Sequence, residues 1–398
     1  MKVAYSPLTK KFLREAYDRY REIGLFWGSQ VLLTSCYVAT DQRWLFMKFG
    51  SSGAGKTISD QIALEAFGER LRPLKISGRL TPAGVVKMMK KAEKSRRARE
   101  DLRRFQEARL IFVEDLSRCT THYLKLTSIQ FLAGLTQNTS LDDLTSEGGT
   151  LGEKLGDEPK KAMVAGTPSD WEEIASTSLY EEFIDRRSLT CIALMRPEEW
   201  RQRELRARNT LKSKPDWLII KEWIDMIRQA DVTPYFGPMR IRKVGSARDS
   251  LYGKLREFKK YPENLLMMID SLAEGHARIN GRDIVLPEDY EVLDKLFSRF
   301  LRIADMKKKE LYIVEEIVRS GTGSLSIQAL TYLLRARARR RGIPELKVVQ
   351  KTVYNYVSMS KYLTKNRASR NNPSLVSLSP YLQTIFKEWR REIGELIQ

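Results

Sequence analysis

The sequence has 398 residues, of which 42% are hydrophobic and 30% charged, and its formal net charge is +20. This composition is typical of a globular protein with two or three domains and excludes an intrinsically disordered chain. No apolar run approaches the roughly 20 residues that span a membrane, and the N-terminus lacks the apolar stretch of a signal peptide. Three widely separated cysteines and two histidines provide no zinc-ligand cluster and favour a reducing, cytoplasmic location. The basic excess favours a polyanionic partner.

The first forty residues predict a helix, because Phe12, Ala16, Tyr20 and Ile23 recur at helical spacing. Five short apolar runs follow, each succeeded by a helical or irregular stretch. Strands that alternate with helices predict an α/β fold with a parallel sheet. The five runs are Trp44–Phe49, Pro73–Ser77, Arg109–Val113, Ala162–Gly166 and Leu189–Met195.

Beyond Pro197 the strand signal fades, and residues 198 to 303 predict helices, most strongly from Leu265 to Ile279. The segment from Lys307 onward carries 18 Lys and Arg and 7 Glu, a net charge of +11 and over half of the total. It shows three helical patterns, at about 308–320, 325–341 and 347–365, and a polar stretch at 367–373 that suits a hairpin wing. We therefore expect four parts: a helical segment 1–40, an α/β core 41–197, a helical part 198–304 and a C-terminal domain 305–398.

The segment from Gly50 to Thr57 follows the first apolar run directly and has the pattern of a phosphate-binding loop. Its glycines let the backbone approach phosphate without a Cβ in the way, and the helix that begins at Lys56 favours an anion at its N-terminus. Lys56 suits the β- and γ-phosphates, and Thr57 suits Mg²⁺. The pattern predicts ATP and Mg²⁺ binding through Gly50, Ser51, Ser52, Gly53, Ala54, Gly55, Lys56 and Thr57.

Two adjacent carboxylates, Glu114 and Asp115, follow the third apolar run. An ATPase needs one carboxylate in the Mg²⁺ shell and commonly a second that orients or deprotonates the attacking water. Two registers remain open. In one, Glu114 faces the metal and Asp115 the water; in the other, Asp115 serves the metal and the base lies elsewhere.

This series of motifs resembles the AAA+ ATPases and, within them, the ATPase module of MCM-type helicases, over roughly residues 40 to 300. The resemblance implies that Thr167 contacts the γ-phosphate or the attacking water. It also implies that Arg186 or Arg187 acts as an arginine finger on the nucleotide of the next subunit. Asn264 stands where the family carries an arginine at the start of the helical lid. The segments that carry the resemblance, besides the phosphate loop, are 80–84, 162–168, 182–187 and 271–289.

Two basic regions are candidates for DNA contact. Residues 85 to 109 form a charged helical stretch, which is either a DNA-tracking surface or a solvated helix face. The C-terminal segment resembles a winged helix, which binds either DNA or another protein. Its candidate DNA-binding residues are Arg337, Arg340, Lys351, Asn355, Lys361, Arg367 and Arg370.

These patterns together lead us to expect a Mg²⁺-dependent ATPase that acts on DNA as an MCM-like helicase or translocase in replication. We expect a homo-oligomer, either a hexameric ring or a filament, with no membrane partner. The alternative is a non-motor ATP switch on DNA, such as a replication initiator, a helicase loader or a transposition regulator.

Overall fold

The computed structural model divides the chain into two compact units, which we describe separately. The first contains the described residues between Phe26 and Ala193 and between Pro215 and Ala304, together with Thr9; the second contains those from Asp305 onward. None of the described helices is long and apolar enough to cross a membrane. The structure describes residues 9, 26–50, 55–78, 80–137, 159–175, 177, 184–193, 216–230, 232–241, 245–256, 262–300, 308–320, 322–340, 349–366, 374–380 and 382–383.

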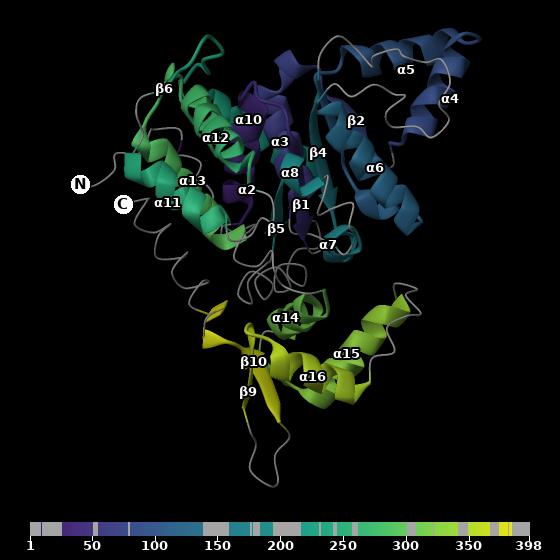
Figure 1. Ribbon diagram of the computed structural model, residues 1–398, viewed down its shortest axis with the longest axis vertical. Helices are drawn as coiled ribbons and strands as arrows, with labels where there is room; N and C mark the ends of the chain where they lie inside the picture. The colour runs from purple at the N-terminus through teal and green to yellow at the C-terminus, as the bar shows by residue number, and fades with distance from the viewer. Residues whose placement is uncertain are drawn as a thin grey trace. The chain divides into compact units, whose positions relative to one another are not determined.

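The first unit contains a five-stranded parallel sheet with the strand order β2-β3-β4-β1-β5 (Figure 1). Each strand begins and ends within two residues of its predicted run where the structure describes it, so the α/β prediction is confirmed for this sheet. Both faces of the sheet are covered, which is why its strands appear in the sequence as nearly continuous apolar runs. The strands are β1 (Leu45–Gly50), β2 (Leu74–Ile76), β3 (Leu110–Val113), β4 (Lys161–Gly166) and β5 (Ser188–Ala193).

Alternate side chains of β1 pack against helices on opposite faces of the sheet. Phe46 contacts Tyr37 of α2 on one face, whereas Phe49 contacts Trp171 of α7 on the other. Figure 1 shows α2 and α3 on the side of the sheet opposite to α6 and α7. The helices around the sheet are α2 (Phe26–Ala39), α3 (Lys56–Phe67), α4 (Pro82–Ala92), α5 (Arg96–Glu107), α6 (His122–Leu135), α7 (Pro168–Ala175) and α8 (Asp185–Arg187), with short 3-10 turns η2 (Glu69–Leu71) and η3 (Leu116–Arg118).

Helix α2 lies within the predicted N-terminal helical segment and is buried along its described side chains, from Gln30 to Ala39. Its C-terminal carbonyl groups accept hydrogen bonds from the buried ammonium of Lys161, the first residue of β4, at 2.5 Å from Tyr37 O and 3.3 Å from Val38 O. Burial lowers the pKa of Lys161 well below its usual value. The residues that predicted the earlier part of the helix, Phe12 to Ile23, lie outside the described residues.

The charged helical stretch predicted over residues 85 to 109 consists of two helices, α4 and α5. The chain turns at Ser95, whose backbone is extended (φ −139°, ψ 127°). The break lets Val85 and Phe105 both reach the core beside the sheet. A single continuous helix of this length would point one of these apolar positions away from that core.

Four more helices and a short two-stranded sheet follow in the first unit, in the region predicted to be helical. The predicted bounds of Leu265–Ile279 are confirmed as α12. This helix packs closely on α2: a Cβ built on Gly275 would lie 2.6 Å from the carbonyl carbon of Cys36. The elements are α10 (Asp216–Arg228), β6 (Arg240–Ile241), α11 (Gly245–Arg256), α12 (Leu265–Ile279), β7 (Ile284–Val285) and α13 (Pro287–Phe300).

The described residues of the second unit form three helices and a three-stranded antiparallel sheet of order β8-β10-β9. Its third helix is shorter than the predicted 347–365: it ends at Met359, and Lys361 lies in the following turn. The Ser360 hydroxyl accepts a hydrogen bond from Tyr362 N at 3.1 Å, a local bond that competes with the helix. The elements are α14 (Lys308–Ser320), β8 (Ser324–Ser326), α15 (Ile327–Arg340), α16 (Gln350–Met359), β9 (Leu363–Asn366) and β10 (Leu375–Leu378).

Candidate functional site

The predicted phosphate loop connects the carboxyl end of β1 to the N-terminus of α3. Gly55 precedes the helix in a left-handed conformation (φ 76°, ψ 11°), which disfavours any residue with a Cβ. The Lys56 ammonium donates a hydrogen bond to the carbonyl of Gly50, 2.8 Å away, so this side chain folds back toward the strand end. The loop residues Ser51 to Ala54 lie outside the described residues. Gly50, Lys56 and the first turn of α3 thus come together at one edge of the sheet.

Glu114 lies beside Thr57 at this same edge. The Thr57 hydroxyl donates to the backbone carbonyl of Glu114 at 3.4 Å, and the Gln61 amide donates to the Glu114 carboxylate at 3.2 Å. Mg²⁺ in phosphate-transfer sites commonly takes one or two carboxylates together with phosphate oxygens. A hydroxyl and a carboxylate side by side at a helix N-terminus fit that donor set, so Thr57 and Glu114 are the residues that would hold Mg²⁺.

The Asp115 carboxylate turns away from Thr57. It caps η3 by accepting hydrogen bonds from the backbone N–H of Ser117 at 3.1 Å and from its hydroxyl at 2.6 Å. Its other oxygen lies 3.8 Å from Arg118 Nε. Of the two carboxylates that the sequence left open, Glu114 is therefore the one that contacts α3, the helix that follows the predicted phosphate loop.

Gln61 is a site residue that our sequence reasoning missed. It lies four residues after Thr57 on α3, and residues four apart share a helix face. The same spacing could have identified Gln61 once Thr57 was assigned to the site. Its amide restrains the Glu114 carboxylate by the hydrogen bond described above.

Thr167 directly follows β4, the strand between β1 and β3, and so lies at the same sheet edge as the phosphate loop. Its hydroxyl donates to the Asp170 carboxylate at 2.7 Å, and that carboxylate also accepts from Thr167 N at 2.7 Å. The arrangement caps the N-terminus of α7. The predicted sensor hydroxyl is thus engaged in a local cap in this structure.

Lys125 of α6, another residue that our sequence reasoning missed, pairs with Asp170 beneath this cap. Its ammonium lies 2.6 Å from Asp170 and 2.8 Å from Glu173, and Asp170 is only 1% exposed. Burial alone would lower the pKa of Lys125, but the hydrogen bonds to the two carboxylates outweigh it and raise the pKa. Spacing in the sequence gives no signal for this pair, because α6 and α7 meet only in the fold.

Arg186 and Arg187 precede β5 at the edge of the sheet opposite to the phosphate loop. In the parallel register of β1 and β5, Ser188 pairs with Leu45, whereas Ala193 pairs with Gly50. Six residues of strand, roughly 16–20 Å at about 3.3 Å per residue, separate the two edges. That separation is more than an arginine side chain bridges, so neither arginine reaches the phosphate loop of its own chain.

The two arginines differ in their surroundings. Arg186 is exposed, and its backbone carbonyl accepts a hydrogen bond from the Asn264 amide at 2.9 Å. Arg187 is partly buried, and burial together with the neighbouring charge of Arg186 lowers its pKa. Asn264, which stands at the position where an arginine was expected, thus contacts the segment that carries the predicted finger.

A buried ion pair behind the phosphate loop was also missed. Lys48 of β1 pairs with Asp60 of α3, and its ammonium donates to the hydroxyls of Thr34 and Ser59 at 2.9 Å each. Burial lowers the pKa of Lys48 and raises that of Asp60, while the charge of each partner opposes the shift. The pair ties the first turns of α3 to β1 and α2. A lysine inside an otherwise apolar strand was its only sequence signal.

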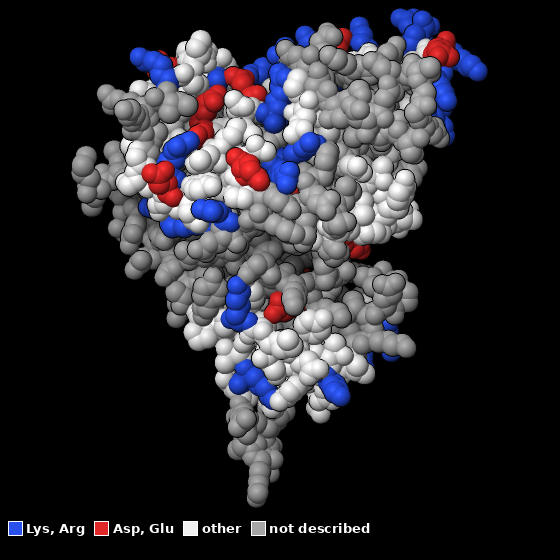
Figure 2. All heavy atoms as spheres, in the orientation of Figure 1, with Lys and Arg blue, Asp and Glu red and all other residues white. Residues whose placement is uncertain are grey.

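A basic hollow of about 530 Å³ lies between α4 and α5. Figure 2 shows Lys and Arg side chains gathered over these two helices. The nearby carboxylates of Glu100 and Glu107 pair with Arg104 and Arg103 instead of with the cations of the hollow. Its lining cations are Lys87, Lys90, Lys91, Lys94 and Arg97, beside one acid, Asp101.

The residues predicted to contact DNA in the second unit are only partly described. Lys351 and Asn355 are exposed on α16 and lie four residues apart. Tyr354 lies on the same helix, three residues after Lys351. Lys361 lies beyond that helix, with its ammonium 5.1 Å from the ring of Tyr362. The side chains of Arg337 and Arg340 on α15, and all of Arg367 and Arg370, lie outside the described residues.

Comparison with solved structures finds distant structural neighbours. No protein-family model matches the chain, and no curated protein matches it in sequence. A full-length MCM homolog from Methanopyrus kandleri is 12% identical, with a TM-score of 0.36 over 76% of this chain and 63% of that chain. A "putative ATPase" from Cytophaga hutchinsonii ATCC 33406 is 15% identical, with a TM-score of 0.34 over 71% of this chain and 84% of that chain. The chain spans less than two thirds of the length of the MCM homolog.

Proposed function

We propose that the chain is a Mg²⁺-dependent ATPase of the AAA+ kind that works as a homo-oligomer on DNA. The observation that carries the proposal is the position of Lys56 and Thr57 at the N-terminus of α3, with Glu114 beside Thr57. A helix N-terminus, a lysine, a hydroxyl and a carboxylate are together the groups that phosphoryl transfer requires. ATP and Mg²⁺ are the ligands that match them.

Each group has a distinct role in this proposal. The backbone N–H groups of α3 and the Lys56 ammonium bind the β- and γ-phosphates. Thr57 and Glu114 hold Mg²⁺, and the Glu114 carboxylate, restrained by Gln61, orients the attacking water and accepts its proton. Water then forms the new bond to the γ-phosphorus as the bond to the ADP oxygen breaks.

The position of Arg186 supports an oligomeric enzyme. Since it lies at the sheet edge opposite to its own phosphate loop, it can stabilise the transferring phosphoryl group only in a neighbouring copy. A hexameric ring or a helical filament would each place one copy's Arg186 against the next copy's nucleotide. Arg187 is less suited to this role because it is partly buried.

The DNA assignment rests on charge. The five cations of the hollow between α4 and α5 suit a phosphate backbone. The C-terminal unit orders its elements as helix, strand, two helices and two strands, which is an arrangement that suits a winged helix. We propose an MCM-like helicase or translocase in replication as the activity.

The second candidate is a non-motor ATP switch on DNA, such as a helicase loader, a replication initiator or a transposition regulator. Two contacts favour it: the Thr167 hydroxyl is engaged by Asp170, and Asn264 stands where an arginine was expected. Both would slow hydrolysis relative to a motor. Strand displacement with DNA-stimulated turnover supports the motor, whereas slow turnover with ATP-dependent assembly on DNA supports the switch.

The ATPase proposal is tested with single and mixed variants. Lys56→Ala should abolish ATP turnover. Lys75→Ala, which replaces a lysine in the outermost strand β2, should not. Arg186→Ala should keep nucleotide binding and lose hydrolysis. Mixing it with Lys56→Ala protein should restore part of the activity, because an intact Arg186 then meets an intact Lys56. Normal turnover by Lys56→Ala would overturn the ATP site, and absence of restoration would overturn the finger in trans.

A further inference from the structure

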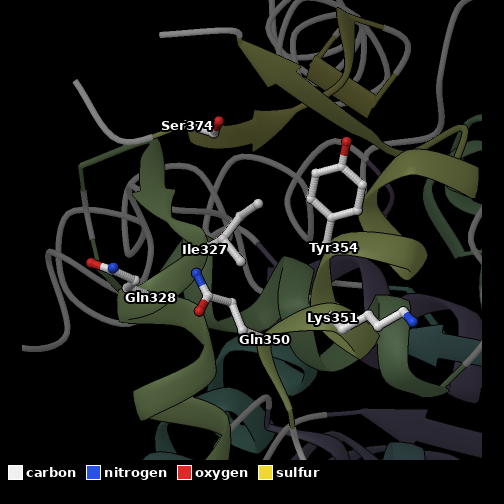
Figure 3. A pocket seen from close by; sticks show the side chains of 6 residues that line it. All are labelled: Ile327, Gln328, Gln350, Lys351, Tyr354 and Ser374. Atoms are coloured by element: carbon white, nitrogen blue, oxygen red, sulfur yellow. The ribbon is translucent and has the colours of Figure 1, made fainter. Parts of the chain in front are cut away.

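A hollow of about 410 Å³ opens in the second unit between the first turns of α15 and α16 and the start of β10. Figure 3 shows Ile327 in the middle of the set, with Tyr354, Gln350 and Ser374 around it. The volume lies in the range of about 300–1,000 Å³ that is typical of small-ligand clefts. From its lining we propose that this hollow binds one unstacked base of single-stranded DNA, a binding site that rests on the proposed action on DNA. The lining residues are Ile327, Gln328, Gln350, Lys351, Tyr354 and Ser374.

The hollow has an aromatic surface on which a base can stack. Tyr354 is 44% exposed although its ring is large and apolar, and buried Ile327 provides an apolar floor beside it. Aromatic side chains exposed in this way are the platforms on which proteins stack unpaired bases. The Lys365 ammonium lies 3.7 Å from the centre of the Tyr354 ring, which fixes the ring and places a cation beside it.

The hollow has a rim of polar side chains. The Gln350 and Gln328 amides offer both donors and acceptors, and the Ser374 hydroxyl offers one of each. Among the described residues none of these three side chains has a hydrogen-bond partner, so they are available for the edge of a base. The Watson–Crick edges of the bases in a duplex are already paired, whereas those of a single strand are not, so a rim that binds this edge favours a single strand.

The described charged side chains at the hollow are all positive. Lys351 lines the hollow, Lys365 lies against its aromatic wall, and no acidic side chain is among the lining residues. Two cations beside an apolar, amide-rimmed cleft complement a base that is joined to phosphates on both sides.

The test measures the affinity of the full chain for a fluorescent single-stranded oligothymidine and for a mixed-sequence duplex at one fixed salt concentration. Tyr354→Ala should weaken single-strand binding about 5- to 100-fold, the range for loss of one stacked base, and should change duplex binding little. Tyr354→Phe should keep the affinity. The matched control is Tyr332→Ala, since Tyr332 is a 72% exposed tyrosine of α15 that does not line the hollow.

Three outcomes would overturn the inference: unchanged single-strand affinity for Tyr354→Ala, an equal loss for the duplex, or the same loss for Tyr332→Ala. DNA-free ATP turnover of each variant is measured in parallel. Loss of ATP turnover in Lys56→Ala with intact single-strand binding supports both proposals. Absence of single-strand binding in the unmodified protein would overturn the base-binding site and leave the ATPase proposal unaffected.

Discussion

Replacing Gly275 with alanine tests the contact between α2 and α12 most directly. Gly275 lies in α12 against the backbone of Cys36 in α2, with no side chain between the two helices at this point. An alanine Cβ would lie 2.6 Å from the Cys36 carbonyl carbon and 3.0 Å from its Cα, and it would overlap the carbonyl oxygen. The obstacle is backbone, so no side-chain rotation relieves it.

The magnitude follows from two opposing terms. Alanine favours the helix over glycine by about 0.5–1 kcal/mol. Forcing a methyl group into a close-packed contact costs about 1–3 kcal/mol, and a backbone obstacle belongs at the upper end. The net loss is therefore about 2–2.5 kcal/mol. For a unit of this size that corresponds to a melting temperature lower by roughly 4–10 °C.

The assay is thermal unfolding of the two variants Gly275→Ala and Gly253→Ala beside the unmodified chain. Gly253 also lies inside a helix, α11, but a Cβ there meets nothing within 4 Å. Gly253→Ala should therefore raise the melting temperature by a few degrees. If Gly275→Ala were to raise it to the same extent, α2 and α12 would not pack as described.

Three further predictions concern single side chains. Glu114→Gln should lower ATP hydrolysis about 100-fold or more with ATP binding retained, whereas Asp115→Asn should keep most of the activity; equal losses in a turnover assay would contradict their different orientations. Gly55→Ala should weaken ATP binding about 5- to 30-fold, because the left-handed conformation costs a residue with a Cβ about 1–2 kcal/mol; calorimetry with unchanged affinity would refute the strain. Burial alone would raise the pKa of Asp289, but hydrogen bonds to His276 and Arg282, and the charges of these two residues, lower it. Its stabilising contribution is therefore complete above the unfolded pKa of about 3.9 and is lost as the pH falls through the folded value. Asp289→Asn should cost about 3–5 kcal/mol at neutral pH in urea unfolding, and the difference from the unmodified chain should shrink below about pH 3.

The sequence predicted the sheet well because both of its faces are buried. A strand such as β1 must then be apolar at nearly every position, and that signal does not depend on which element covers it. The amphipathic helix α12 was predicted to the residue for a similar reason. The phosphate loop could be proposed from the sequence because its chemistry requires glycine, lysine and threonine at fixed spacing within one short segment.

What the sequence did not predict depends on contacts between distant segments. The chain breaks between α4 and α5 because Val85 and Phe105 both reach the same core. The charged residues continue through both helices, so the sequence pattern gives no sign of the break. The orientations of Glu114 and Asp115 follow from partners on α3 and η3. Neighbouring carboxylates look alike in a sequence, and only the fold decides which one meets Gln61 of α3.

The N-terminal helix α2 has a consequence for how the protein is made. Its residues are buried, yet its close partner α12 begins more than 200 residues later in the chain. At about 5–20 residues per second, a ribosome needs roughly 10–50 s to produce that partner after α2 has emerged. Throughout that interval the surface of α2 that packs against α12 remains without this partner. Aggregation during translation, and a demand for chaperones that protect nascent chains, should therefore be most sensitive to substitutions that make residues 30 to 39 more apolar.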